Sequence, residues 1–214
     1  MFAERPLTGA SACSLHQTRG GDPDAGRASG ESTGAGHTWR VTTISDGVIT
    51  LRPPREDDID AIHAACQDPE IQRWTALPSP YHRDDAVSYA ERVATERESG
   101  RTASFVCVDD KGRMLGSFAV MEMDKAPRYG EIGYWVAAEA RRRGVASRAV
   151  ALLRDWAAAE LGLQLIELII HPDNAPSRRV AERTGFRETS ELRPAPRRED
   201  PGPPNHAVYA WRAA

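Results

Sequence analysis

The stretch Arg141-Arg142-Arg143-Gly144-Val145-Ala146 decides how this chain is interpreted. It lies between a segment expected to be a strand ending near Ala137 and a segment expected to be a helix starting near Ser147. The first main-chain N–H groups of a helix have no partner inside it, and together with the helix dipole they attract anions. Because Gly144 and Ala146 carry little side chain, a pyrophosphate can approach the main chain here. The stretch therefore predicts a phosphate-binding turn.

The sequence after this turn is patterned as a helix and then as a buried strand. Residues 147–161 carry an apolar stripe at helical spacing, and Gly162 follows as a stop signal. Residues 165–170 are nearly continuous in apolar side chains, which is typical of a buried strand. Strand, helix and strand over about 40 residues predict a right-handed parallel crossover.

The rest of the chain adds strands and helices on both sides of this crossover. Pro69 interrupts the first helix, and the turn Asp109-Asp110-Lys111-Gly112 joins two strands as a hairpin. The expected fold class is α/β (α+β), a mixed and mostly antiparallel sheet with a central parallel pair, flanked by helices. The expected strands are residues 48–52, 102–108, 114–122, 129–137, 165–170, 186–192 and 207–212, and the expected helices are residues 56–66, 83–99, 147–161 and 176–183.

Composition excludes several classes of protein. The chain has 214 residues and a formal net charge of −3, so no global charge draws it to nucleic acid or membrane. Its cysteines, Cys13, Cys66 and Cys107, are odd in number and show no pairing pattern, which argues against a disulfide framework. No CxxC or HExxH motif indicates a metal site. With no long apolar run and no secretory signal, a cytoplasmic location is expected.

Two segments differ from the patterned sequence. Residues 1–40 are rich in small polar residues and poor in large apolar ones, so we expect a disordered extension. Residues 194–204 are rich in proline and are expected to form a loop between the last two strands. One domain is therefore expected over residues 41–214.

Four segments together resemble the GNAT superfamily of N-acetyltransferases. The R-x-x-G-x-A pattern between strand and helix is similar to its acetyl-CoA signature, and residues 131–136 resemble the strand before it. Residues 174–186 resemble its N-x-x-S…GF block. Leu51-Arg52-Pro53 followed by Glu56-Asp57-Asp58 resembles the opening of the RimJ/RimL-like branch, which acetylates protein N-termini and assorted small amines. The resemblance covers residues 48–212 and implies a GNAT-like sheet.

The resemblance also implies a site for acetyl-CoA as co-substrate, without a metal. Main-chain atoms near Trp135 and Val136 are expected to pair with the pantetheine arm and to polarise the thioester carbonyl. Asn174 is expected to contact the same arm, and its side chain also suits the cap of the helix that follows. The main-chain amides expected to hold the pyrophosphate are those of Arg141, Arg142, Arg143, Gly144, Val145 and Ala146.

For catalysis, the resemblance implies direct attack of an amine on the thioester. Ser177 sits where a hydroxyl can protonate the departing thiolate, and a hydrogen bond within the first helical turn is the structural alternative. An ammonium has no lone pair, so a carboxylate has to take its proton. Glu131 is the first candidate and Glu122 the second, although a strand carboxylate without a catalytic role is the alternative for Glu131. Some relatives carry an acidic residue after a Leu-Arg pair, but here Pro194 follows that pair.

The acceptor is expected to bind between the first helices. Residues 74–81 combine aromatic and apolar surface with rigid prolines, and Trp74 and Tyr81 are expected to line this site. For Trp74, a position in the core is the alternative. The acceptor amine stays open between a protein N-terminus and a small molecule, and so does the oligomeric state, a homodimer included.

Two alternatives of other classes compete with an enzyme. The missing acidic residue is compatible with a catalytically silent module that binds acyl-CoA. The three consecutive arginines fit a solvated loop or a nucleic-acid contact, but no aromatic side chains alternate with them as a platform for bases.

Overall fold

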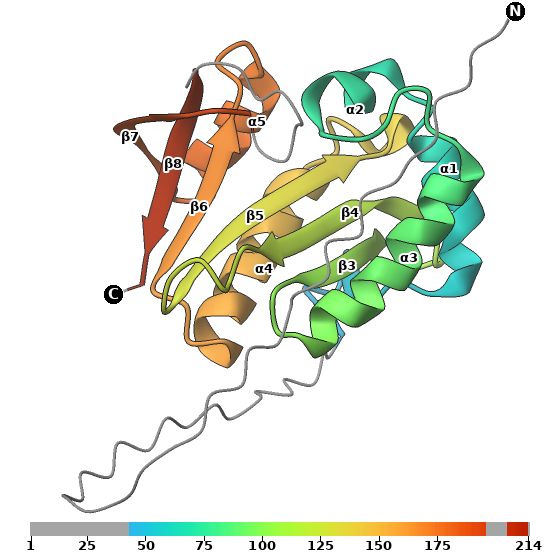
Figure 1. Cartoon of the computed structure of the whole chain (residues 1–214), viewed down its shortest axis with the longest axis horizontal. Coiled ribbons are helices and arrows are strands. Elements are labelled where there is room, and N and C mark those ends of the chain that lie inside the picture. Colours follow the sequence, from blue (N-terminus) through green and yellow to red (C-terminus); the bar gives the residue numbers. More distant parts are fainter. Residues whose placement is uncertain (1–42, 196–204, 214) are drawn as a thin grey trace, which may run out of the picture. The chain divides into compact units, whose positions relative to one another are not determined.

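The computed structural model describes residues 43–195 and 205–213. The expected disordered extension, residues 1–40, lies outside these ranges, and so does most of the Pro-rich loop. The strands of the described part form one sheet in the order β1-β2-β3-β4-β5-β6-β8-β7 (Figure 1). They are β1 (Ile44–Ser45), β2 (Thr50–Arg52), β3 (Ala103–Val108), β4 (Met114–Met121), β5 (Tyr129–Val136), β6 (Leu165–Ile170), β7 (Arg187–Arg193) and β8 (His206–Arg212).

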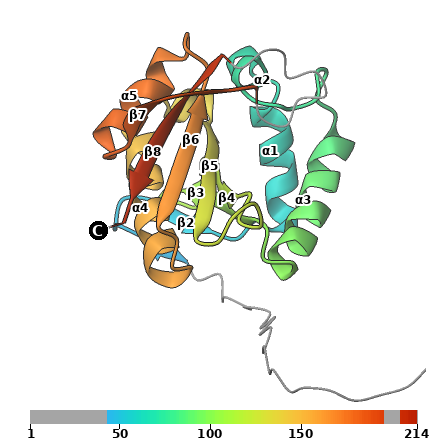
Figure 2. The same cartoon turned by 60° about the vertical axis from the view of Figure 1, so that its left-hand side comes forward.

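Helices cover both faces of this sheet. Figure 2 shows α4 and α5 on one face and α1 and α3 on the other. Two 3-10 turns, η1 (Glu56–Asp58) and η2 (Ala138–Ala140), precede α1 and α4 respectively. The helices are α1 (Ile59–Ala65), α2 (Pro69–Trp74), α3 (Arg83–Glu98), α4 (Val145–Glu160) and α5 (Ala175–Arg183).

Each face of the sheet has its own hydrophobic core. Every residue of β3 is buried, because both of its faces are covered. Toward α4, Phe105 meets Trp156 edge to face, with ring centroids 5.1 Å apart. On the opposite face, the Tyr89 hydroxyl lies 3.1 Å from the Ser117 hydroxyl. The apolar stripe expected for α4 is therefore confirmed as a core-facing stripe.

The parallel pair at the centre of the sheet is short. Strands β5 and β6 pair only at Tyr129 with Leu165, Gly130 with Ile166 and Glu131 with Glu167. Beyond Glu131, β5 continues alongside β4, whereas β6 follows β8. Residues 132–136 of β5 thus have one edge without a strand partner among the described residues.

The expected strands and helices are present, and the pattern did not predict the short strand β1. Helix α4 begins at Val145, two positions before the expected start, because Gly144 in left-handed conformation (φ 78°) is its N-cap. The first helix begins as the 3-10 turn η1. Pro69 ends the first helix as expected, and it is also the first residue of a second helix, α2. The pattern did not predict α2.

The motif around Leu51-Arg52-Pro53 has a structural role. The Arg52 guanidinium makes a bidentate pair with the Asp58 carboxylate, and both N–O distances are 2.7 Å. The Arg55 main-chain N–H donates to the same carboxylate over 2.8 Å. This buried pair fastens η1 and α1 to the sheet.

Candidate active site

The turn before α4 offers a row of free main-chain donors. Arg142 (φ 60°) and Gly144 (φ 78°) both adopt left-handed conformation, which turns the chain sharply into the helix. No described residue accepts a hydrogen bond from the N–H groups of residues 142–147. A Cβ atom at Gly144 would meet nothing within 4 Å. The turn therefore presents open N–H groups at the positive end of a long helix, which is an arrangement suited to an anion.

Arg141 differs from the sequence expectation. Its main-chain N–H already donates to the Ala138 carbonyl over 3.3 Å, so this amide is not among the free donors. Its side chain is held at two points instead. Nε donates to the Val136 carbonyl over 3.2 Å, and Nη2 lies 3.0 Å from Asp68 Oδ2. The Arg141 main-chain N–H is already hydrogen-bonded because Arg141 is the C-cap of the 3-10 turn η2.

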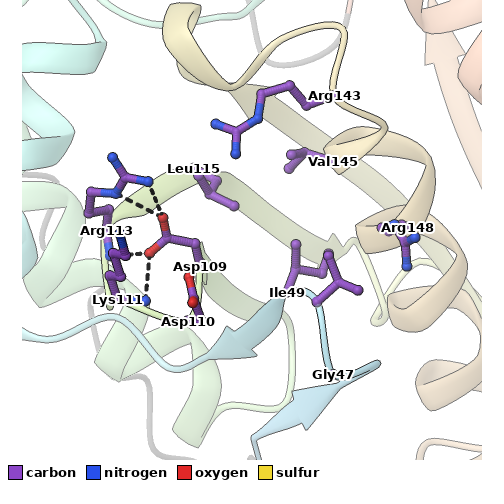
Figure 3. A pocket seen from close by; sticks show the side chains of 11 residues that line it. Gly47, Ile49, Asp109, Asp110, Lys111, Arg113, Leu115, Arg143, Val145 and Arg148 are labelled. Carbon is purple, nitrogen blue, oxygen red and sulfur yellow. Dashed lines mark hydrogen bonds and ion pairs between the residues drawn. The ribbon is translucent and has the colours of Figure 1, made fainter.

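A pocket of about 470 Å³ adjoins this turn. Figure 3 shows Arg143, Val145 and Arg148 at the start of α4, opposite the β3–β4 turn with Lys111 and Arg113. Arg113 pairs with Asp109 at 2.7 Å and Arg148 pairs with Asp46 at 2.7 Å. Arg143 has no carboxylate partner among the described residues. Neither Asn174 nor Ser177 lines this pocket, so it is separate from the place where acetyl transfer is expected.

Trp135 and Val136 occupy the unpaired edge of β5. The β4 side of both residues is hydrogen-bonded, with Trp135 in register with Ser117 and Val136 with Gly116. The Trp135 side chain packs against the core beneath α1 and α3. Their main chain therefore lies beyond Glu131, the last residue of β5 that pairs with β6.

Asn174 and Ser177 meet at the start of α5. The Asn174 side-chain oxygen accepts the Ser177 main-chain N–H over 3.2 Å, so Asn174 caps this helix. Both side chains are half-buried. Capping was one of the two roles expected for Asn174, and it leaves the side-chain NH₂ group available for a second contact.

The two candidate carboxylates lie side by side. Lys125 Nζ is 3.3 Å from Glu122 Oε2 and 3.8 Å from Glu131 Oε2, so one ammonium bridges both. Glu131 is only 3% exposed and is the last residue of β5 that pairs with β6. Glu122 is half-buried, directly after β4. The structure thus places Glu131 nearer than Glu122 to the point where the strands part.

A third carboxylate near this point, Glu167, is buried and was not predicted. It faces Glu131 across the parallel pair and lies 2.7 Å from Arg193 Nη1. The Tyr129 hydroxyl also donates to it over 2.9 Å. Burial, together with the nearby charges of Glu131 and Glu167, raises the pKa of Tyr129, so its hydroxyl remains a donor. The sequence feature that could have identified Glu167 is that it is the single charged residue within the apolar run of residues 165–170.

The two expected acceptor residues have different surroundings. Tyr81 is only 4% exposed, packs in the core between α1 and α3, and stacks on His63 with ring centroids 6.4 Å apart. It is therefore a core residue, and little of its ring is left to contact an acceptor. Trp74 is half-buried at the end of α2, and its ring lies 5.4 Å from that of His171, which follows β6. Trp74 thus extends from the first helices toward the end of β6.

The described ranges contain neither a metal-binding cluster nor a membrane-spanning helix. In residues 43–195 and 205–213, no three His, Cys, Asp or Glu side chains are grouped as a metal site would require. Over the same ranges, no helix has the length and apolar character needed to cross a membrane.

Comparisons with known proteins agree with this architecture. YoaA of Bacillus subtilis (strain 168), named as an uncharacterized N-acetyltransferase, is 25% identical over 146 residues, which are 68% of this chain and 82% of YoaA. Mycobacterium smegmatis RimJ, solved with CoA-disulfide, is 28% identical with a TM-score of 0.72, covering 82% of this chain and 89% of RimJ. RimL, a ribosomal alpha-N-protein acetyltransferase solved with coenzyme A, shares the fold at 16% identity, with a TM-score of 0.71 and coverage of 80% and 98%.

The acetyltransferase (GNAT) domain family matches residues 49–187, which contain the turn before α4, the parting strands and the start of α5. This match confirms the expected fold class and, at the level of the family, the expected acetyl transfer from acetyl-CoA. The chain therefore belongs to the GNAT acetyltransferase family.

Proposed function

We propose that this acetyltransferase acetylates the α-amino group of a protein. The observation that carries the proposal is the row of free N–H groups of residues 142–147 beside the unpaired edge of β5. These donors suit the pyrophosphate of acetyl-CoA, and the edge of residues 132–136 suits its amide-bearing pantetheine arm. The pantetheine would then lead the thioester toward Glu131, where the strands part.

Two side chains flank this point and supply the remaining chemistry. The bound thioester provides an activated acetyl group, so the chain has only to orient it and manage protons. Ser177, in the first turn of α5, is the proposed hydroxyl donor to the departing sulfur. Asn174 caps the same turn through its oxygen and so fixes the position of Ser177.

Glu131 is the proposed acceptor of the amine proton. Its carboxylate is buried on the face of the sheet that carries α1 and α3, opposite α4. Because so little of it is exposed, a water molecule is the proposed intermediary between the amine and Glu131. Glu167 is a poorer base, because its carboxylate is already ion-paired with Arg193 and accepts a hydrogen bond from Tyr129.

The choice of acceptor rests on two supporting observations. The Arg52–Asp58 pair belongs to the segment that resembles the RimJ/RimL-like branch. The similarity to Mycobacterium smegmatis RimJ, at 28% identity over most of both chains, supports the same branch. The half-buried Trp74 next to His171 is the proposed wall of the acceptor site.

A panel of amines tests this proposal. The purified chain is incubated with acetyl-CoA and peptides that differ in their first residue, with polyamines and aminoglycosides as small amines, while thiol release and product mass are measured. We expect acetylation at the peptide α-amino group, and peptides with a blocked N-terminus serve as controls. Acetylation of small amines alone would contradict the protein acceptor. Binding of CoA without turnover on any amine would support the catalytically silent module.

A further inference from the structure

The turn between β6 and α5 is folded around His171, the first residue after β6. Its ring nitrogen Nδ1 accepts the Asp173 main-chain N–H over 3.1 Å, and its carbonyl accepts the Asn174 N–H over 2.9 Å. A side-chain acceptor that binds the main chain two residues further on fixes the conformation of a turn, as an Asx turn does. The ring and the carbonyl of His171 therefore hold the two residues that precede α5.

This turn sets where the first turn of α5 begins. The Asn174 side-chain oxygen accepts the Ser177 N–H over 3.2 Å. Three hydrogen bonds thus lead from His171 through Asn174 to the residue proposed to donate to the departing sulfur. A shift of about 1 Å at a reacting group can cost on the order of 100-fold in rate, so the shape of this turn bears directly on the chemistry of Ser177.

The His171 ring also contacts aromatic side chains from two other elements. Its centroid lies 5.4 Å from that of Trp74, at the end of α2, and 5.1 Å from that of His206, the first residue of β8. Trp74 is itself fixed from its own helix, because its Nε1–H donates to Glu70 over 3.0 Å and the Arg73 guanidinium lies 4.4 Å from the centre of its ring. The His171 ring therefore joins the end of α2 to the turn before α5.

We infer that His171 is a positioning residue that couples the proposed acceptor wall at Trp74 to Ser177, and this inference rests on the proposed function. An acceptor that packs against Trp74 steadies the His171 ring through the contact between the two rings. The ring nitrogen then keeps the Asp173 N–H, and the capped turn keeps Ser177 in place while the thiolate departs. Ser177 is thereby best positioned when the acceptor site is filled.

Two substitutions of His171 in the full chain separate its two contacts. His171→Phe keeps a ring against Trp74 but removes the acceptor of the Asp173 N–H. His171→Asn places a side-chain oxygen near the position of Nδ1 but removes the ring. We expect His171→Phe to lower kcat roughly tenfold with little change in the KM for the acceptor, as the loss of one hydrogen bond behind a reacting group does. His171→Asn should instead raise the KM for the acceptor several-fold and affect kcat less, because Trp74 loses a neighbouring ring.

Two further variants distinguish positioning from a purely structural role. His63→Phe is the control, since it makes the same exchange in a ring that stacks on Tyr81, and it should leave kcat unchanged. In a Ser177→Ala background, His171→Phe should cause no further loss of kcat, because His171 acts through Ser177. An unchanged kcat in His171→Phe, or an additional tenfold loss in the Ser177→Ala background, would contradict the inference.

Amide hydrogen exchange, measured by NMR without any acceptor, separates this inference from the proposed function. We expect the amides of Asp173 and Ser177 to exchange about tenfold faster in His171→Phe and at wild-type rates in His171→Asn. Trp74→Ala should also speed exchange at both amides, whereas Trp74→Phe, which keeps a ring, should not. If the wild type acetylates no peptide α-amino group, the proposed function fails and these rates still decide the inference. Wild-type exchange in Trp74→Ala would show that Trp74 does not hold the His171 ring and would overturn the coupling.

Discussion

Asp68 Oδ2 lies 3.0 Å from Arg141 Nη2, and this ion pair joins the start of α2 to the turn before α4. The other oxygen of Asp68 accepts the Glu70 N–H over 2.7 Å and so caps α2. One carboxylate therefore holds the helix that carries Trp74 against the turn proposed to hold the pyrophosphate. The proposed cofactor site and the proposed acceptor wall are physically connected through it.

Asp68→Asn tests this connection, because asparagine caps a helix as well as aspartate does but carries no charge. We expect the KM for the acceptor to rise several-fold, while the free energy of unfolding changes by less than about 1 kcal/mol. Steady-state kinetics and urea unfolding measure the two effects. Asp60→Asn is the control, since it removes only the exposed ion pair with Arg83. Equal acceptor KM values in both variants would show that the pair does not position α2.

Gly144→Glu should abolish CoA binding. The substitution places bulk and negative charge at the free N–H groups of the turn, and the left-handed conformation adds a backbone cost of about 1 kcal/mol. Gly162→Glu is the matched control. Gly162 has a similar φ (66°), a Cβ atom added there would also meet nothing within 4 Å, and it lies beyond the other end of α4. Calorimetric titration with CoA compares the two variants, and retained affinity in Gly144→Glu would place the pyrophosphate elsewhere.

Glu131→Gln should lower kcat by about 100-fold or more with little change in the KM for acetyl-CoA, as expected for loss of a general base. Glu167→Gln is the comparison, because its carboxylate is held by Arg193 and Tyr129 and is expected to matter more for stability than for turnover. Initial rates and thermal unfolding of both variants separate the two roles. A larger loss of kcat in Glu167→Gln would reverse the assignment.

The Asp58 carboxylate should make stability depend on pH. Burial works against its ionisation, but the Arg52 guanidinium and the Arg55 N–H outweigh burial and hold the pKa of Asp58 below its ordinary value. The ionised carboxylate therefore adds its full share to the free energy of unfolding above the pKa of about 3.9 that Asp58 has in the unfolded chain. This stabilisation is lost as the pH falls through the lower pKa that Asp58 has in the folded protein. Asp58→Asn should cost on the order of 3 kcal/mol at pH 7 and progressively less below pH of about 4. Urea unfolding across this range measures the difference, and a cost that is independent of pH would contradict it.

Local sequence patterns determined the parts of this protein that depend on neighbours along the chain. Apolar spacing defined α4 and β6, and Gly144 marked the turn between strand and helix because few residues other than glycine adopt its backbone conformation readily. The GNAT resemblance and the position of Ser177 after Asn174 also lie within short segments. These features can be predicted without the tertiary structure, because helix and strand propensity and turn formation depend on only a few neighbouring residues.

Only the tertiary structure decided the features that depend on which faces meet. Tyr81 looks like an accessible aromatic residue in a proline-rich loop, but packing of α1 against α3 buries it. Glu167 looks like an isolated charge in a strand until Arg193, far along the chain, reaches it. Likewise, Asp68 meets Arg141 only because α2 folds against the turn before α4. Burial and electrostatics are set by contacts distant in sequence, so a linear pattern identifies the chemistry but not its surroundings.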